Sequence, residues 1–189
     1  MHELILGGVR SGKSAAAIAR AQAWLAAAGR EATFIATAVA GDAALRERIA
    51  AHARERAQRV PALATVEAPL DLPEAIARCT TPQRLLVVDC LTLWLANLRA
   101  PLAGAPLADA AFEARVQALL DALAAAAGPV VLVSNEIGLG VLPADALSRG
   151  YVDDLGRLHQ RAAALCARVT LMVAGIEVPV KVPDRVASA

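Results

Sequence analysis

The sequence predicts an α/β fold in which a mostly parallel β-sheet carries helices on both faces. Short runs rich in leucine or β-branched residues alternate with longer alanine-rich stretches of helical period along the 189 residues. Two runs, 85–89 and 130–133, are almost continuously apolar, as in strands that are buried on both faces. This alternation implies parallel strands joined by right-handed crossovers. The length suits one domain and no linker or repeat is visible, so we expect residues 1–189 to form a single domain.

Each element has a local signal in the sequence. Apolar runs mark the strands, helical spacing of apolar residues marks the helices, and glycine or proline closes several of them. In the first half we expect strand 3–6, helix 13–28 ending at Gly29, strand 33–37, the charged helix 42–59, strand 65–67, helix 72–78 and strand 85–89. In the second half we expect helix 92–99, a loop over 100–108, helix 110–127 closed by Gly128 and Pro129, strand 130–133, helix 144–167, strand 169–173 and an edge strand over 178–182, where proline is tolerated.

Composition excludes several classes of protein. Lysine and arginine (19) nearly balance aspartate and glutamate (18), whereas nucleic-acid and membrane-surface proteins normally carry a basic excess. Hydrophobic residues reach 57% but aromatic residues only 3%, which indicates alanine-rich helices rather than membrane spans. Met1 leads directly into an apolar strand, without a targeting segment. We therefore expect a cytoplasmic protein with no nucleic-acid partner and no membrane span.

The three cysteines do not suggest a framework of cross-links. Cys79, Cys90 and Cys166 are odd in number and have no CxxC spacing. A disulfide set or a zinc site is therefore not expected. We interpret the three thiols as small buried apolar groups.

The turn after the first strand carries a phosphate-binding motif. Residues 7–14 satisfy GxxxxGK[ST] in full, directly after a strand and directly before a helix. The glycines let backbone N–H groups approach phosphate oxygens, and the helix start adds unsatisfied N–H groups and the positive end of its dipole. The lysine is expected to neutralise the β- and γ-phosphates, and the serine hydroxyl to ligate Mg²⁺. The predicted nucleoside-triphosphate site comprises Gly7, Gly8, Val9, Arg10, Ser11, Gly12, Lys13 and Ser14.

Such a loop needs a carboxylate for the metal, normally at the end of a neighbouring buried strand. Asp89 follows four large apolar residues at the carboxyl end of its strand, where ligands bind in open α/β sheets. We expect it to contact the metal or the nucleotide, and the alternative is that it caps the helix near Thr92. Glu136 occupies the corresponding end of the next strand and is available for substrate, metal or water. Its segment includes Asn135, Gly138 and Gly140 and is too rich in glycine to be a simple connection.

A histidine on the charged helix is the candidate nucleophile. Arg48, His52 and Arg56 are spaced four residues apart and share one helix face. The two guanidinium groups disfavour a third positive charge, which favours a neutral, nucleophilic imidazole, and they can hold a triphosphate while it attacks. His159 lies between Arg157 and Arg161 on a long amphipathic helix, and we expect it at the surface or at an interface.

Taken together, these segments resemble the bifunctional adenosylcobinamide kinase / adenosylcobinamide-phosphate guanylyltransferase family of cobalamin biosynthesis. The matching segments are Leu4 to Ser14, Phe34 to Ala38, Arg48 to His52, Thr65 to Pro69, Val88 to Thr92, Val133 to Pro143 and the turn from Gly175 to Val178. They span nearly the whole chain in order, and Asn-Glu-x-Gly-x-Gly-x-x-Pro with the upstream histidine is the most specific of them. The resemblance implies a P-loop NTPase fold of the RecA-like type.

The resemblance also implies a two-step reaction. ATP or GTP phosphorylates the hydroxyl of the aminopropanol arm of adenosylcobinamide. A histidine then attacks the α-phosphate of GTP, and the GMP carried on it passes to the corrinoid phosphate to give adenosyl-GDP-cobinamide. His52 matches the guanylylated histidine, with Lys13 as the other catalytic residue. The nucleotide contacts implied outside the P-loop are Ala36, Thr37, Ala38, Ala53, Arg54, Glu55, Arg56, Glu67 and Asp89.

Two alternatives stay open from the residues themselves. One is a P-loop kinase for another small metabolite, in which His52 takes no part. The other is a RecA-like regulatory NTPase that changes partner on hydrolysis. The alanine-rich helices suit packing between subunits, so we expect a homo-oligomer, and the resemblance favours a trimer.

Overall fold

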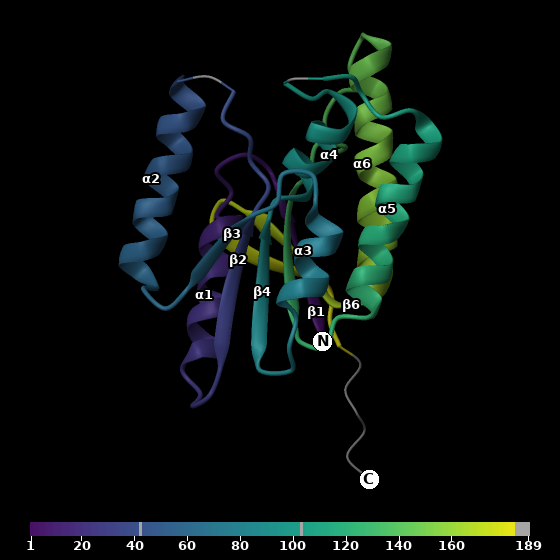
Figure 1. Ribbon diagram of the computed structural model, residues 1–189. Helices are drawn as coiled ribbons and strands as arrows, with labels where there is room; N and C mark the ends of the chain where they lie inside the picture. Colours follow the sequence, from purple (N-terminus) through teal and green to yellow (C-terminus); the bar gives the residue numbers. More distant parts are fainter. Residues whose placement is uncertain (42, 103, 184–189) are drawn as a thin grey trace.

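The computed structural model describes residues 1–41, 43–102 and 104–183, without the side chains of residues 44, 45 and 48. Its centre is a seven-stranded sheet of order β3-β2-β4-β5-β1-β6-β7 (Figure 1). The strands β3, β2, β4, β5, β1 and β6 pair in parallel, and β7 pairs antiparallel with β6 at the edge. The strands are β1 (His2–Gly7), β2 (Glu31–Ala36), β3 (Ala64–Glu67), β4 (Arg84–Asp89), β5 (Val130–Asn135), β6 (Cys166–Val173) and β7 (Ile176–Lys181). The mostly parallel α/β prediction is confirmed.

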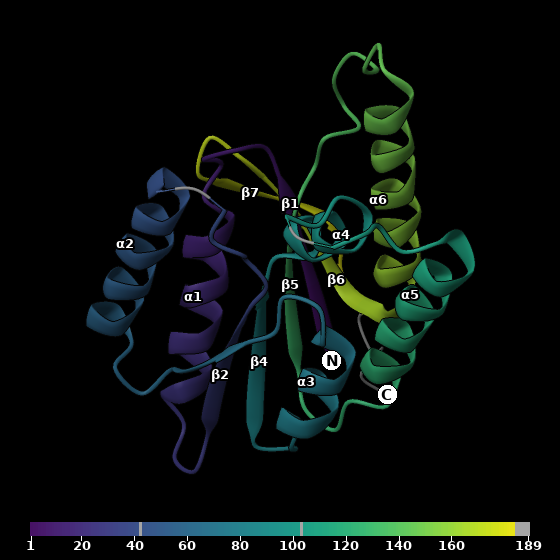
Figure 2. The same cartoon turned by 45° about the horizontal axis from the view of Figure 1, so that its top comes forward.

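Helices cover both faces of this sheet (Figure 2). They are α1 (Lys13–Leu25), α2 (Ala43–Arg59), α3 (Leu72–Cys79), α4 (Leu91–Arg99), α5 (Asp109–Ala124) and α6 (Ala146–Leu165). All the expected elements are found within the described residues, with ends that differ by a few residues, and the expected first residue of the charged helix, Asp42, lies outside the described residues. The first helix is shorter than expected and stops at Leu25. Gly29, the expected end of the helix, lies in the turn before β2 with a φ of 73°. The sixth strand was expected from residue 169 and starts at Cys166, directly after the last residue of α6.

Alternating residues of the central strands supply two separate cores. On β4, Leu86 and Val88 pack with α3, α4, α5 and α6, in a cluster that contains the fully buried Trp94. Leu85 and Val87 of the same strand face the other side, where α1 covers the sheet. A strand with both faces buried therefore reads as a continuous apolar run, which is why its position was predictable.

The parallel strands bring their last residues to one edge of the sheet. Gly7 pairs with Asn135, and Ala36 pairs with both Asp89 and Glu67. Five strands thus end at the same edge, and each ends on a residue that the sequence marked as a site candidate. Ligands of open α/β sheets bind at this edge.

The cysteines have no disulfide partner among themselves, and the interpretation as buried groups holds for two of them. Cys90 and Cys166 are buried, whereas Cys79 is half-buried. In the described part of the chain, no helix combines the length and the apolar character needed to cross a membrane.

Candidate active site

The loop between β1 and α1 has the backbone of a phosphate cradle. Gly12 stands at the N-cap of α1 with a φ of 102°, and the first turn has neither a side-chain cap nor an acidic residue. The N–H groups at this helix start are therefore free of competing side-chain acceptors, which suits an anion. Gly7 is needed for space, because a Cβ there would lie 2.5 Å from the carbonyl oxygen of Met172. The loop also contacts the turn between β6 and β7, where the Gly175 N–H donates to Ser11 O at 2.9 Å.

The two side chains at the end of the motif point to different partners. Lys13 is only 7% exposed, and its Nζ donates to Gly8 O at 2.6 Å, so the ammonium group folds back over the loop. Burial lowers the pKa of Lys13, opposed by the negative charge of Asp89. The Ser14 hydroxyl donates to Asp89 Oδ2 at 2.8 Å. Loop and strand β4 are thus joined through the serine and the carboxylate that the sequence proposed as metal ligands.

Asp89 lies among positive charges. Burial raises its pKa, and the hydrogen bond from Ser14 and the charges of Arg56, Lys13 and His52 oppose that rise. A serine hydroxyl beside a carboxylate is a hard oxygen pair of the kind that Mg²⁺ uses together with phosphate oxygens. Among the described residues there is no cluster of three or more histidine, cysteine, aspartate or glutamate side chains that could hold a metal ion. The residues present therefore fit Mg²⁺.

The alternative role of Asp89 as a helix cap is wrong. Cys90 is the N-cap of α4, and its Sγ accepts the Leu93 N–H at 3.4 Å. The chain reaches the cap one residue after the strand ends, so the aspartate side chain stays on the sheet edge and is available to a ligand.

Thr37 joins the ends of β2 and β4. It is fully buried, its hydroxyl donates to Cys90 O at 2.7 Å, and the same oxygen accepts the Cys90 N–H at 2.7 Å. Its own carbonyl accepts from Asn97 Nδ2 at 2.8 Å. The hydroxyl group and the carbonyl group of Thr37 thus both have hydrogen-bond partners inside the protein. The residue sets the position of the Asp89–Cys90 backbone.

His52 lies on α2, which Figures 1 and 2 show beside α1 at the margin of the molecule. Its side chain is exposed, and a positive charge on this imidazole lowers the pKa of Asp89. One turn later the Arg56 guanidinium stacks over the Phe34 ring at 3.8 Å, and burial lowers its pKa. The buried Nε of Arg56 has no hydrogen-bond partner within the described residues. This face of α2 therefore carries an accessible imidazole and, one turn later, an incompletely paired guanidinium that lies on Phe34 of β2.

The other sequence candidates differ in their surroundings. The side chain of Arg48 is outside the described part of the structure. Ala53 is exposed, and on the same helix Arg54 pairs with Glu47 at 2.7 Å and Glu55 with Arg59 at 3.2 Å, so these two candidates are engaged along the helix surface. Ala36 and Ala38 are half-buried at the end of β2, and Glu67 is exposed at the end of the edge strand β3.

The segment after β5 is fastened to the P-loop. The Glu136 N–H donates to Gly7 O at 3.0 Å, and Glu136 Oε1 accepts the Gly138 N–H at 2.6 Å. The Asn135 N–H donates to Thr92 Oγ1 at 2.7 Å. Beyond this turn, Gly140 and its neighbours are exposed. Asn135 and Glu136 thus lie between the strand of the P-loop and the strand of Asp89.

The expected surface position of His159 is wrong. It is only 7% exposed, and its Nε2 lies 2.7 Å from Ser134 Oγ. Sequence spacing contained the signal, because Leu155, Leu158, His159 and Ala162 follow one buried stripe of α6. Ser134 Oγ lies 3.0 Å from Thr92 Oγ1, and the Tyr151 hydroxyl donates to Thr92 O at 2.6 Å. None of these three residues was predicted as a site residue.

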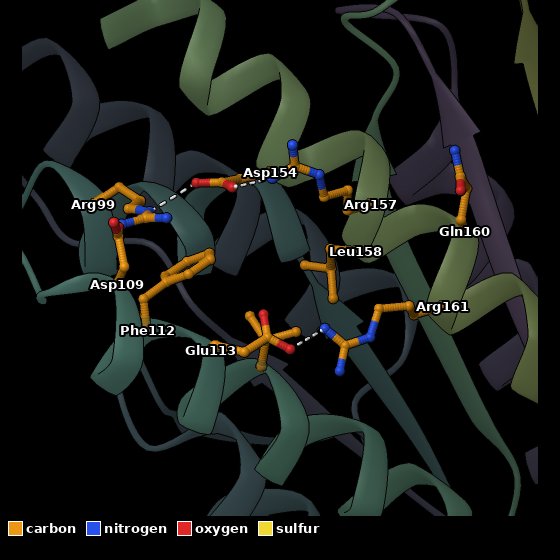
Figure 3. Close-up of a pocket in the computed structure, with 10 residues that line it drawn as sticks. Arg99, Asp109, Phe112, Glu113, Asp154, Arg157, Leu158, Gln160 and Arg161 are labelled. Atoms are coloured by element: carbon orange, nitrogen blue, oxygen red, sulfur yellow. Dashed lines mark hydrogen bonds and ion pairs between the residues drawn. The ribbon is translucent and has the colours of Figure 1, made fainter.

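A cavity of about 550 Å³ lies away from this edge, between α5 and α6 (Figure 3). Its charged side chains are paired with one another: Arg99 with Asp109 and Asp154, each at 2.7 Å, and Arg161 with Glu113. Paired charges leave little to recognise a ligand, so the candidate site remains the sheet edge.

Comparison with known proteins agrees with this geometry. A family model described as "Cobinamide kinase / cobinamide phosphate guanyltransferase" matches residues 3–180. The chain belongs to this family. A bifunctional adenosylcobalamin biosynthesis protein, CobP of Pseudomonas aeruginosa, is 46% identical over 96% of this chain and 98% of its own length. A bifunctional adenosylcobalamin biosynthesis protein of Escherichia coli, CobU, is 33% identical over 94% of this chain and 98% of its own length.

Solved structures extend the comparison to the fold. A KaiC-like protein from Pyrococcus horikoshii superposes with a TM-score of 0.52 at 16% identity, covering 90% of this chain and 69% of its own. The flagellar accessory protein FlaH of Methanocaldococcus jannaschii gives 0.50 at 11% identity, covering 96% and 78%. This member of the cobinamide kinase / guanyltransferase family is therefore an enzyme with a RecA-like P-loop fold.

Proposed function

We propose that the chain catalyses both reactions of its family on one sheet edge. In the first, ATP or GTP phosphorylates the aminopropanol hydroxyl of adenosylcobinamide. In the second, GMP passes from GTP through His52 to adenosylcobinamide phosphate and gives adenosyl-GDP-cobinamide. The observation that supports the proposal is a P-loop whose Ser14 hydroxyl donates to Asp89 at 2.8 Å, with Arg56 and His52 of α2 close enough for their charges to act on the pKa of that carboxylate.

The P-loop residues supply the electrostatics of both reactions. Backbone N–H groups at the start of α1 and the Lys13 ammonium group bind the triphosphate. To reach the phosphates, the ammonium group leaves its contact with Gly8 O. Ser14 and Asp89 are the proposed ligands of Mg²⁺, which supplies positive charge to the phosphate oxygens when bound. These fixed charges stabilise the negative charge that spreads over the transferring phosphorus centre.

His52 divides nucleotidyl transfer into two displacements. Its imidazole nitrogen attacks the α-phosphorus of GTP, the bond from that phosphorus to the bridging oxygen breaks, and pyrophosphate leaves with the electron pair. The phosphate oxygen of the corrinoid then displaces the histidine. Arg56 is proposed to hold phosphate oxygens; in support, the charge of Asp89 acts on its pKa and its Nε lacks a hydrogen-bond partner in the described structure.

The remaining proposals concern the corrinoid side and the assembly. Asn135, Glu136, Gly138 and Gly140 are proposed to face the corrinoid, because their segment leaves the sheet beside the P-loop strand. Glu67, Ala36, Ala38 and residues 53–55 remain proposed nucleotide contacts by resemblance. The cytoplasm is the proposed compartment, since it supplies nucleoside triphosphates. A homo-oligomer, with a trimer favoured by resemblance, is proposed for the assembly.

Replacing the nucleophile separates the two reactions. We expect His52→Asn to form adenosylcobinamide phosphate from adenosylcobinamide and to form no adenosyl-GDP-cobinamide, as measured by chromatography of the corrinoids. Gln58→Ala, an exposed change on the same helix, is the matched control and should leave both steps intact. A His52→Asn enzyme that still completes the second step would refute the assigned role. Wild-type protein that phosphorylates a different metabolite and not adenosylcobinamide would favour the kinase alternative.

A further inference from the structure

A row of buried polar groups runs from the start of α4, through the end of β5, to α6. Thr92 Oγ1 lies 3.0 Å from Ser134 Oγ, and Ser134 Oγ lies 2.7 Å from His159 Nε2. The other ring nitrogen, His159 Nδ1, faces Glu136 Oε2 at 3.8 Å. Ser134 is fully buried, and Thr92 and His159 are at most 8% exposed. Polar groups buried this deeply in an apolar core need each other as partners.

One arrangement of donors satisfies every group of this row. Thr92 Oγ1 accepts the Asn135 N–H at 2.7 Å, so its own hydrogen is free for Ser134 Oγ. With the Ser134 hydroxyl as the donor to His159 Nε2, the imidazole hydrogen is on Nδ1, the nitrogen that faces the Glu136 carboxylate at 3.8 Å, an electrostatic contact beyond hydrogen-bond distance. The opposite order would turn a lone pair of Nδ1 toward a carboxylate. Burial lowers the pKa of His159, which favours a neutral imidazole with a single ring hydrogen.

The row ends at a group that a substrate can reach. Serine, histidine and carboxylate in this sequence activate nucleophiles in hydrolases, but no substrate can reach the fully buried Ser134. The Glu136 side chain is 21% exposed. One carboxylate oxygen of Glu136 accepts the Gly138 N–H, and its backbone N–H donates to Gly7 O of the P-loop. The accessible end is thus a fixed carboxylate beside the phosphate-binding loop.

The other described carboxylates at the strand ends are less suited to accept a proton from the substrate. Asp89 accepts the Ser14 hydroxyl and is proposed as a metal ligand. Glu67 ends the edge strand β3, and β2, β4 and β5 separate it from the P-loop strand β1. Glu136 directly follows β5, the strand that pairs with β1, and its N–H donates to Gly7 O.

We propose that Glu136 accepts the proton of the corrinoid hydroxyl in the kinase step, and that His159 is the positioning residue that orients its carboxylate. The inference rests on the proposed function. The hydroxyl oxygen bonds to the γ-phosphorus, and the bond from that phosphorus to the β,γ-bridging oxygen breaks. The nucleoside diphosphate leaves with the electron pair, and the hydroxyl proton moves to Glu136. The Ser134–Thr92 side of the row holds His159 in place.

The two reactions differ in their need for this base. In the kinase step the attacking group is an alcohol, which must lose its proton. In guanylyl transfer the attacking group is a phosphate that is already ionised at neutral pH, and the group attacking GTP is an imidazole. Glu136 is therefore needed in one half of the catalytic sequence and dispensable in the other.

The test measures each half separately. Glu136→Gln keeps the shape of the side chain and removes the base, so kcat for phosphorylation of adenosylcobinamide should fall by about 10²- to 10⁴-fold. The rate at which the same variant converts adenosylcobinamide phosphate and GTP into adenosyl-GDP-cobinamide should fall far less than the kinase kcat, because this step needs no base even if the corrinoid contact is weakened. Glu113→Gln, a change of an exposed carboxylate on α5, is the matched control and should alter neither rate.

Each outcome decides the proposal. An undiminished kinase rate in Glu136→Gln overturns it. If Glu136→Gln loses both halves, Glu136→Asp decides: a partly active kinase with full transfer supports the base, and equal loss of both halves overturns it. Wild-type protein without activity on adenosylcobinamide would instead sink the proposed function, so the two failures are distinguishable.

His159 is tested by a split between kcat and KM. His159→Ala should lower the kinase kcat, leave the KM for adenosylcobinamide and the transfer rate near wild type, and be partly rescued by His159→Gln, which restores a donor. Parallel loss of kinase and transfer in both variants would mean a merely structural role and would overturn the positioning assignment.

Discussion

The contact between Thr37 and Cys90 offers a quantitative test of how the site is built. Thr37→Val keeps the volume and removes the hydroxyl that serves both polar groups of the Cys90 backbone. The Cys90 carbonyl keeps the Trp94 N–H as a partner, at 3.1 Å, so only the Cys90 N–H loses its acceptor. An orphaned buried donor costs about 1–3 kcal/mol. We expect the free energy of unfolding to fall by that amount, and Tm by about 2–4 °C per kcal/mol.

The assay is urea denaturation combined with the kinase rate. Thr37→Ser is the matched control, because it keeps the hydroxyl and loses one buried methyl group, at about 0.8 kcal/mol. The valine variant should also lose kinase activity, since the freed Cys90 backbone adjoins Asp89, whereas the serine variant should keep it. A valine variant as stable and as active as wild type would show that this contact does not hold the carboxylate in position.

Three further changes have defined outcomes. Lys13→Ala should weaken both phosphorylation and covalent guanylylation, and undiminished guanylylation would place the triphosphate away from the loop. Gly7→Ala puts a Cβ 2.5 Å from a backbone carbonyl and should cost about 1–3 kcal/mol by urea denaturation, whereas Gly8→Ala, with open space around its Cβ, should cost far less. Burial lowers the pKa of both His159 and His2 below 6.5, so below that pH the unfolded chain binds protons that the folded chain does not. The free energy of unfolding should therefore decrease on acidification below pH 6.5, with a shallower slope in His159→Gln, and an unchanged slope would contradict the assignment.

Much of the fold was predictable because each element carries its own local signal. The buried strand Arg84–Asp89 reads as a continuous apolar run, and the P-loop stands in its strand–helix context. The convergence of Gly7, Asp89 and Asn135 then follows from parallel pairing alone, since the carboxyl ends of parallel strands share one edge. The positions of the main site candidates were thus consequences of topology.

The polar contacts between distant segments were not predictable in the same way. The bond between Thr37 and Cys90 joins residues 53 positions apart, and that between Ser134 and His159 residues 25 apart, so neither leaves a periodic trace. A histidine flanked by Arg157 and Arg161 looks solvated in sequence, although its own helix position follows the buried stripe. The cap of α4 was equally hard to predict, because Cys90 accepts through sulfur and lacks the usual capping oxygen.

The central claim is that His52 carries GMP covalently between GTP and the corrinoid. The most direct measurement incubates the protein with Mg²⁺ and GTP labelled at either the α- or the γ-phosphate, denatures it and looks for protein-bound label. The account predicts acid-labile, alkali-stable label from the α-position only, and none in His52→Asn. Wild-type protein that consumes GTP without becoming labelled, or label that persists in His52→Asn, would contradict it.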